Sequence, residues 1–271
     1  MRFPCVLIAV ALVASGRPAA GFELVGTTGG TSLSLCEIDK ATGALESSFC
    51  DSIGLISPYD LASNPRIDPL VWAVTRDFFG DGKIELVGID TQRKELASRT
   101  SIMIDEPLLT LAVDPTGHFY ATTATQLVRL DPISGDVTVI GDTMSSVENG
   151  LAFDSSGALY GIGGGRRLMR IDVESGAATL VGDVTDVFRI EDLAFDPDND
   201  ELYGIGYDGV YRLYTIDVAT AEPQVVGPSL GRPSGLAFAA IPEPGTVVLG
   251  LAWALAGCCG RHGRTSRMLC G

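Results

Sequence analysis

A phrase of about 40 residues recurs along this chain, and it constrains the fold more than any other feature. Its clearest copy is GLAFDSSGALYGIGGGRRLMRIDVESGAATLVG at residues 150–182. Apolar residues fall there in four short runs separated by turn residues, which predicts one four-stranded antiparallel sheet. The phrase returns as DLAFDPDNDELYGI at 192–205 and as LAVDPTGHFYAT at 111–122. A period of 40 to 45 residues is typical of β-propeller blades.

The number of copies predicts the size of the ring. The aspartate that ends the third run recurs with spacings of 51, 41, 41 and 45 residues, at Asp39, Asp90, Asp131, Asp172 and Asp217. The first unit starts at its second run (22–27), whereas SGLAFAA at 234–240 is a first run with no unit after it. We therefore expect an all-β, five-bladed propeller over residues 22–240, in which the C-terminal strand completes the first blade and leaves no open sheet edge.

Turn and packing residues agree with this interpretation. The five recurrent aspartates are expected to cap hairpins, because Asp can accept hydrogen bonds from backbone N–H groups within a turn. Glycine is expected where φ must be positive, and Ala221 stands at that position in the fifth unit, which predicts a looser last hairpin. Small residues recur in the first run, where blades crowd near the axis, at Ala112, Ala152, Ala194 and Ala237.

Composition limits the classes of function. Apolar residues make up 46% of the 271 residues, with 33 Gly and 14 Pro, as expected for many short strands and tight turns. The net charge is −15, and it is about −19 over residues 22–241, where 14 Lys and Arg face 33 Asp and Glu. Such a surface repels phosphate backbones, so we expect no nucleic acid partner.

The N-terminal residues 1–21 have the pattern of a signal peptide. Arg2 is followed by an apolar run over residues 3–14 and then by small residues that suit cleavage before Phe22. The run is too short to be a permanent membrane span. We therefore expect export through the Sec machinery.

The C-terminal residues 241–271 combine a Pro-Glu-Pro-Gly motif, an apolar segment at 246–257 and a basic end. The apolar segment would form about 18 Å of helix, short of a ~30 Å hydrocarbon core. Together these features resemble a PEP-CTERM sorting signal, carried here by Pro242, Glu243, Pro244, Gly245, Arg261 and Arg264. The resemblance implies a Gram-negative host, transient anchoring in the inner membrane through the C-terminal helix, recognition by an exosortase, and delivery to the cell surface or extracellular matrix. An ordinary C-terminal anchor helix is the alternative.

The repeat itself is similar to extracellular propellers of the broad NHL and WD40-like kind. That resemblance covers residues 22–240 and implies a binding or scaffold role toward extracellular polysaccharide or a surface protein. It carries over no catalytic residue, because propellers host many functions. The sequence thus predicts a non-catalytic exported propeller. The alternative is a secreted carbohydrate-active enzyme with a carboxylate pair at the channel mouth, which would place two acids about 5–10 Å apart in a pocket.

Cysteine positions agree with export. Cys5 lies in the predicted signal peptide, and Cys258, Cys259 and Cys270 lie in the tail, which leaves Cys36 and Cys50 in the repeat region. Two cysteines in an oxidising compartment commonly form a disulfide. Two free buried thiols are the alternative.

Two acidic stretches are candidate metal sites. Carboxylates at Asp77, Asp81 and Glu85 surround a Gly-containing loop that suits Ca²⁺ and resembles the calcium loop of FG-GAP repeats, although Phe79 replaces a usual ligand. The alternative is a solvated hairpin turn, and no other cofactor is expected. The stretch from Asp196 to Asp200 begins like an EF-hand loop but lacks its later Gly and Glu, so a widened turn is the better interpretation.

Irregular loops are the remaining place to look for function. The insertion at 51–69 carries Tyr59, Asp60, Arg66 and Asp68. We expect it to rim one mouth of the channel together with the loops 105–106, 142–149 and 183–191. His118, the one histidine of the repeat region, is expected to be a solvated turn residue. This leaves no nucleophile–histidine pair and no multi-histidine metal site.

Overall fold

The computed structural model describes residues 21–28, 34–52, 58–76, 83–227 and 233–241. These belong to one compact unit that extends from Phe22 to Ile241. The predicted signal peptide and sorting tail lie outside the described residues. Within the described ranges, no helix is long and apolar enough to cross a bilayer.

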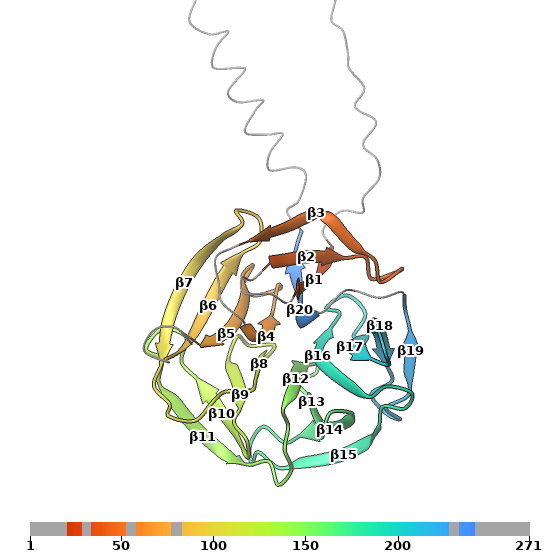
Figure 1. Cartoon of the computed structure of the whole chain (residues 1–271). Coiled ribbons are helices and arrows are strands. Elements are labelled where there is room, and N and C mark those ends of the chain that lie inside the picture. The colour runs from red at the N-terminus through yellow and green to blue at the C-terminus, as the bar shows by residue number, and fades with distance from the viewer. Residues whose placement is uncertain (1–20, 29–33, 53–57, 77–82, 228–232, 242–271) are drawn as a thin grey trace, which may run out of the picture. The chain divides into compact units, whose positions relative to one another are not determined.

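Five four-stranded antiparallel sheets are arranged in a ring (Figure 1). Blade 2 contains β4 (Pro58–Ser63), β5 (Val71–Arg76), β6 (Ile84–Asp90) and β7 (Glu95–Ile102). Blade 3 contains β8 (Thr110–Val113), β9 (Phe119–Thr122), β10 (Gln126–Leu130) and β11 (Val137–Asp142). Blade 4 contains β12 (Asn149–Phe153), β13 (Leu159–Gly163), β14 (Arg167–Ile171) and β15 (Ala178–Asp183). Blade 5 contains β16 (Arg189–Phe195), β17 (Leu202–Tyr207), β18 (Tyr211–Ile216) and β19 (Pro223–Val225). The predicted five-bladed propeller is confirmed.

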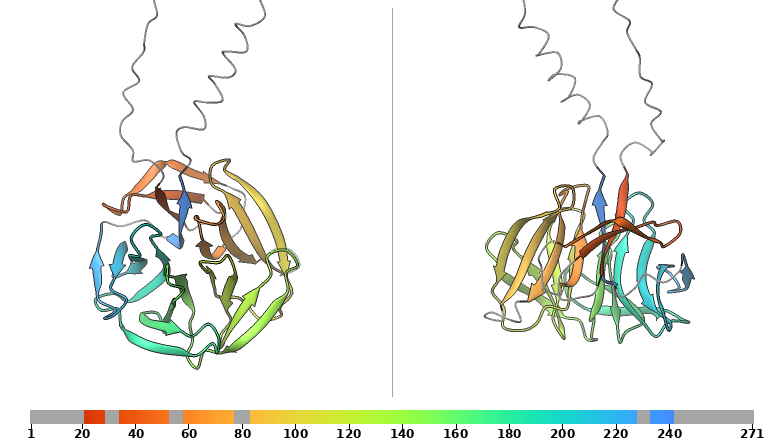
Figure 2. Two further views of the ribbon diagram at one scale, coloured as in Figure 1. Left: turned by 180° about the vertical axis from the view of Figure 1, so that it is seen from behind. Right: turned by 45° about the horizontal axis from the view of Figure 1, so that its top comes forward.

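Blade 1 is made from both ends of the repeat region. Its strand order is β20–β1–β2–β3, with β20 (Pro233–Ala240) innermost, followed by β1 (Phe22–Thr28), β2 (Ser34–Ile38) and β3 (Leu45–Ser52). Strand β20 pairs with β1 in the register Phe22↔Ala240 and Leu24↔Phe238, and the two strands lie side by side in Figure 2. The predicted closure of the ring by the C-terminal strand is confirmed.

The hydrophobic core is divided into five clusters, each of which packs between two neighbouring blades. Aromatic pairs cross the same interfaces: Tyr120–Phe153 at 5.1 Å, Tyr160–Phe195 at 5.6 Å and Tyr203–Phe238 at 6.0 Å between ring centroids. The small residues of the inner strands are buried, as predicted, at Ala112, Ala152, Ala194 and Ala237. Their size lets the inner strands approach near the axis.

Hairpin chemistry repeats as the sequence predicts. Each of the five recurrent aspartates accepts hydrogen bonds from the backbone N–H groups two and three residues later: Asp39, Asp90, Asp131, Asp172 and Asp217. For Asp172, the N–H and hydroxyl of Ser175 and the N–H of Glu174 lower the pKa. These recurrent carboxylates are therefore explained by the fold.

The last hairpin of blade 5 has a regular turn, although its outer strand β19 has three residues, against six in β11 and β15. Ala221 adopts a positive φ of 63°, is fully buried, and donates its N–H to the Asp217 carbonyl at 2.8 Å. Gly176 makes the same bond to Asp172 at 2.8 Å in blade 4. Ala221 packs in the core cluster between blades 4 and 5 and accepts the turn conformation at a strain that for an L-residue is about 1–2 kcal/mol.

Candidate functional site

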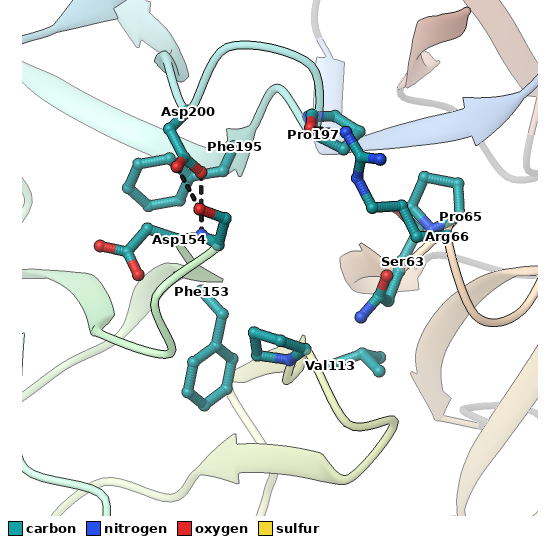
Figure 3. Close-up of a pocket in the computed structure, with 12 residues that line it drawn as sticks. Ser63, Pro65, Arg66, Val113, Phe153, Asp154, Phe195, Pro197 and Asp200 are labelled. Atoms are coloured by element: carbon teal, nitrogen blue, oxygen red, sulfur yellow. Dashed lines mark hydrogen bonds between the residues drawn. The ribbon is translucent and has the colours of Figure 1, made fainter. Parts of the chain in front are cut away.

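A pocket of about 140 Å³ opens at one mouth of the channel, where the first strand of each blade turns into the second (Figure 3). Its walls come from the turns after β4, β8, β12 and β16, so four blades contribute to it. We call this end of the ring the mouth face. The pocket is smaller than the 300–1,000 Å³ of sites that enclose drug-sized ligands. It can hold one small group of a larger ligand.

Apolar side chains form much of the pocket wall. Phe153 and Phe195 end the inner strands of blades 4 and 5, and both remain partly exposed. Their rings are fixed by the contacts with Tyr120 and Tyr160 across the blade interfaces. Prolines from three different turns complete the wall, at Pro65, Pro115 and Pro197. These groups offer a preformed, rigid apolar surface.

The carboxylates at the pocket are engaged in turn and cross-blade hydrogen bonds. Asp154 Oδ1 accepts from the N–H groups of Ser156 and Ala158 at 2.9 and 2.8 Å. Asp200 accepts from the hydroxyl of Ser155 and from its N–H at 2.8 Å, which ties blade 5 to blade 4. Both carboxylates therefore stabilise a turn or join two blades, unlike a pair of acids positioned for proton transfer.

Arg66 connects three blades at the same mouth. Its guanidinium donates to the carbonyl of Pro197, lies 3.7 Å from Asp198 Oδ1, and stands over the ring of Phe22 at 5.3 Å from the centroid. Asn64, two residues earlier, donates its side-chain amide to the carbonyl of Asp114 at 2.7 Å. Arg66 thus lies at the mouth, as expected from the sequence.

The EF-hand-like stretch is a widened turn whose acids have separate partners. Asp196 is buried and its Oδ2 lies 2.5 Å from Lys40 Nζ in blade 1, while Asp198 faces Arg66 in blade 2. Asp200 binds Ser155 in blade 4. The turn therefore ties blade 5 to three other blades. Its carboxylates do not converge on one point that could hold a cation.

Two aspartates that the sequence did not single out as a pair meet inside the channel. Asp60 on β4 and Asp192 on β16 are 1% and 0% exposed, and their carboxyl groups hydrogen-bond to each other. Asp60 also accepts from the N–H of Leu61 at 3.0 Å and of Leu111 in blade 3 at 2.7 Å. Burial and the repulsion between two adjacent carboxylates favour the protonated form of the pair.

Asp192 has the same arrangement in the other half of the ring. It accepts from the N–H of Leu193 at 2.7 Å and from that of Leu236 on β20 at 2.6 Å. Burial, followed by repulsion from Asp192, raises the pKa of Asp60 well above its ordinary value. Burial raises the pKa of Asp192 to about 7. Each carboxyl therefore joins its own inner strand to that of the next blade.

The equivalent positions in the other three blades carry no carboxyl group. They are Thr110 in blade 3, Gly150 in blade 4 and Gly235 in blade 1, each directly before the recurrent leucine. A Cβ on Gly150 would lie 2.5 Å from the Leu193 nitrogen, and one on Gly235 would lie 2.7 Å from Leu61 Cγ. The glycines therefore leave room for the inner strands β16 and β4 to approach closely. Aligning the residue before each leucine is the sequence signal that would have found the pair.

The expectation that the irregular loops form one mouth is wrong. In an antiparallel blade, the loops that enter the first strand and those that follow it lie at opposite ends, so the loops 105–106, 142–149 and 183–191 lie on the face opposite the pocket. Asp60 is buried within the channel, and Asp68 accepts from the N–H of Leu70 and from Trp72 Nε1, both at 3.0 Å. The side chain of Tyr59 lies outside what the structure describes.

The remaining predicted sites are only partly within the described residues. Asp77 and Asp81 lie outside them, and Glu85 on β6 forms an ion pair with Arg99 at 3.3 Å. No group of three His, Cys, Asp or Glu side chains is gathered for a metal within the described part of the chain. His118 lies in an exposed turn and bonds Asp114 Oδ2 at 3.2 Å, as expected. The six residues of the predicted sorting motif also lie outside the part of the chain that the structure describes.

Cys36 is fully buried and disulfide-bonded. The register of β2 with β3 shifts between the pairs Leu35↔Asp51 and Glu37↔Glu46, which places the backbone of Cys50 in the irregular stretch beside Cys36. The side chain of Cys50 lies outside the described part of the structure. The pairing of these two cysteines stays a prediction.

No family model and no curated protein matches this sequence. Solved structures share its fold. A chain of the nidogen–laminin complex superposes with a TM-score of 0.53 at 13% identity, over 81% of this chain and 98% of that one. A chain from work on the de novo evolutionary emergence of a symmetrical protein gives 0.50 at 18% identity, over 79% and 97%. TolB from Acinetobacter baumannii gives 0.50 at 15%, over 80% and 54%. At these identities the likeness shows the fold alone.

Proposed function

We propose that this protein is an exported, non-catalytic propeller that binds extracellular polysaccharide or a surface protein through its mouth face. The observation that carries the proposal is the pocket itself, with fixed aromatic and proline walls contributed by four blades. Its polar side chains are already oriented by hydrogen bonds, as Ser155 and Asp200 illustrate. A rigid, preformed surface of this kind favours binding because little conformational entropy is lost when a ligand docks.

A secreted carbohydrate-active enzyme is the competing function. It needs two carboxyl groups about 5–10 Å apart that substrate can reach. Asp60 and Asp192 are close and do not recur in every blade, which is the observation that favours this alternative. However, they are 1% and 0% exposed, and their oxygens are occupied by backbone N–H groups of the inner strands. This burial supports a role in ring closure for the pair.

The binding role can be tested by filling the pocket. Ser155→Trp places a large side chain at the pocket wall, whereas Ser156→Trp adds the same group to the same exposed turn at a residue that does not line the pocket. We expect the purified full chain to bind ligands in a glycan and surface-protein screen, with Ser155→Trp weakening binding at least about tenfold and Ser156→Trp leaving it unchanged. Equal binding by both variants would contradict a ligand at the mouth.

We further propose that the protein is delivered to the cell surface or extracellular matrix by PEP-CTERM sorting. The support is the order of motif, apolar segment and basic residues in 241–271, together with the signal-like residues 1–21. Intact-mass analysis of protein recovered from the native host should give a chain that begins near Phe22 and lacks the basic end. A host without exosortase should retain that end. Recovery of the full C-terminus from both hosts would refute the proposal.

A further inference from the structure

Three aromatic side chains form a row on the face opposite the mouth, at the end of blade 5. Phe188 directly precedes β16, while Tyr207 ends β17 and Tyr211 begins β18. The ring centroids of Phe188 and Tyr207 are 6.2 Å apart, and those of Tyr207 and Tyr211 are 4.9 Å apart. Phe188 is 71% exposed and both tyrosines are partly exposed. We call these three residues the aromatic platform.

The platform is held by backbone pairing. The N–H of Phe188 donates to the carbonyl of Tyr207 at 2.8 Å, and Tyr207 is the cross-strand partner of Tyr211. The side chain of Arg189 hydrogen-bonds that of Tyr211. The three rings are therefore attached to strand ends, where an aromatic side chain loses little conformational freedom on binding a ligand.

Charged groups beside the platform come in neutral pairs. Arg189 forms an ion pair with Glu191, and Arg212 Nε donates to Asp208 Oδ2 at 2.9 Å. The side chains of Arg189 and Arg212 are 47% and 34% exposed, so their guanidinium groups keep donors that a ligand can reach. The two ion pairs carry no net charge, unlike the repeat region as a whole, in which 33 acidic residues face 14 basic ones.

The fold does not require these rings. The corresponding hairpins carry Thr123, Ala124 and Thr125 in blade 3 and three glycines at 163–165 in blade 4. Among the described residues, the large exposed apolar side chains include one aromatic ring, that of Phe188. The exposed Phe188 ring has no aromatic counterpart in the corresponding hairpins of blades 3 and 4, and it contacts Tyr207, which contacts Tyr211. Such an exposed aromatic cluster indicates a binding surface.

We propose that the aromatic platform binds the pyranose rings of a neutral polysaccharide. A pyranose has an apolar C–H face, which packs on an aromatic ring, and an equatorial rim of hydroxyls, which needs donors and acceptors at the ring edge. The three contacting rings supply the apolar surface, and the exposed guanidinium groups of Arg189 and Arg212 supply donors to the hydroxyls. The charge-neutral ion pairs and the acidic remainder of the domain favour an uncharged chain over a polyanion.

The platform also lies apart from the ends of the repeat region. Phe22 and Ala240 pair with each other at the mouth face of blade 1, whereas the platform is on the opposite face. A glycan on the platform therefore leaves the mouth pocket free. The inference rests on the proposed role as a binding module, and it adds a second surface with a stated ligand class.

Affinity electrophoresis of the purified full chain tests this proposal, because the net charge of −15 carries the protein into a native gel. The gels contain laminarin or hydroxyethyl cellulose as neutral glycans, or alginate as a polyanion. We expect a neutral glycan to retard the wild-type chain and Phe188→Ala to weaken that binding at least about tenfold. Phe188→Trp should retain binding because it keeps a stacking surface. Ile133→Ala, which truncates a 91% exposed side chain in another blade, is the matched control and should bind like the wild type.

Several results would overturn the proposal. Unchanged retardation of Phe188→Ala, retardation by alginate alone, or no retardation by either neutral glycan each contradicts a neutral-glycan platform. If Ser155→Trp abolishes the retardation and Phe188→Ala preserves it, the ligand lies in the mouth pocket. The platform proposal would then be wrong, and the proposed function would stand. Loss in Phe188→Ala with normal binding by Ser155→Trp supports the platform.

Discussion

The buried carboxyl pair makes the stability of this propeller depend on pH in a direction opposite to that of most acidic proteins. The pKa of Asp192 is about 7 in the folded chain, against an ordinary value of 3.8, because the group is buried. A carboxyl with a raised folded-state pKa contributes most at low pH, where both states are protonated. That contribution is lost as pH rises from the unfolded to the folded pKa.

The size of the effect follows from the shift. Each pH unit well between the two pKa values changes the free energy of unfolding by about 1.4 kcal/mol. Because Asp192 is half titrated at pH 7, it alone predicts a loss of about 2 kcal/mol between pH 5 and pH 7. The raised pKa of Asp60 acts in the same direction. Above pH 7, the titration of Asp192 contributes little further change.

Asp192→Asn isolates this contribution. The asparagine oxygen can accept from only one of the two N–H groups of Leu193 and Leu236, so about 1–3 kcal/mol should be lost at pH 5. The variant has no titrating group at residue 192, so its curve should be flatter by about 1.4 kcal/mol per pH unit. Near pH 8 it should match or exceed the wild type.

Urea unfolding at pH 5, 6, 7 and 8, followed by the fluorescence of the buried Trp72, measures this difference. Asp172→Asn is the matched control, because hydrogen bonds lower the pKa of that exposed hairpin cap and place its titration below this range. Its stability should differ from the wild type by the same amount at all four pH values. Parallel curves for Asp192→Asn and the wild type would refute the reasoning.

Three further predictions concern closure and the untested sites. A Cβ on Gly227 would lie 1.6 Å from the Thr42 carbonyl oxygen, so Gly227→Ala should cost about 1–3 kcal/mol in chemical unfolding. Unchanged stability would contradict the contact between blades 5 and 1. Calorimetry should detect calcium uptake that Asp81→Ala abolishes, and absence of uptake by the wild type removes the calcium prediction. Non-reducing peptide mapping should recover a linked peptide that joins Cys36 to Cys50, whereas alkylation of both thiols without reduction would show that they are free.

The sequence alone was sufficient for the architecture. The period of the repeat, the five aspartates that follow the third strands and the unmatched first run at 234–240 predict the blades, their number and the closure of the ring. These features are local or periodic, because a turn needs its own Asp and Gly and a strand needs its own alternation. Arg66 at the mouth and His118 in a turn followed from the same reasoning.

Only the tertiary structure decided which residues from different blades meet. Asp60 and Asp192 are 132 positions apart, and nothing in their own hairpins indicates that they meet in the channel. The loops expected at one mouth are divided between two faces, because the direction of each inner strand separates them. Ala221 likewise adopts a positive φ against its local preference, and it is buried in the cluster between blades 4 and 5. The repeat determines each blade separately, whereas ring closure brings distant side chains together. Aligning the repeats marks Asp60 and Asp192 as departures from the pattern at one ring position, but only the closed ring shows that their side chains meet.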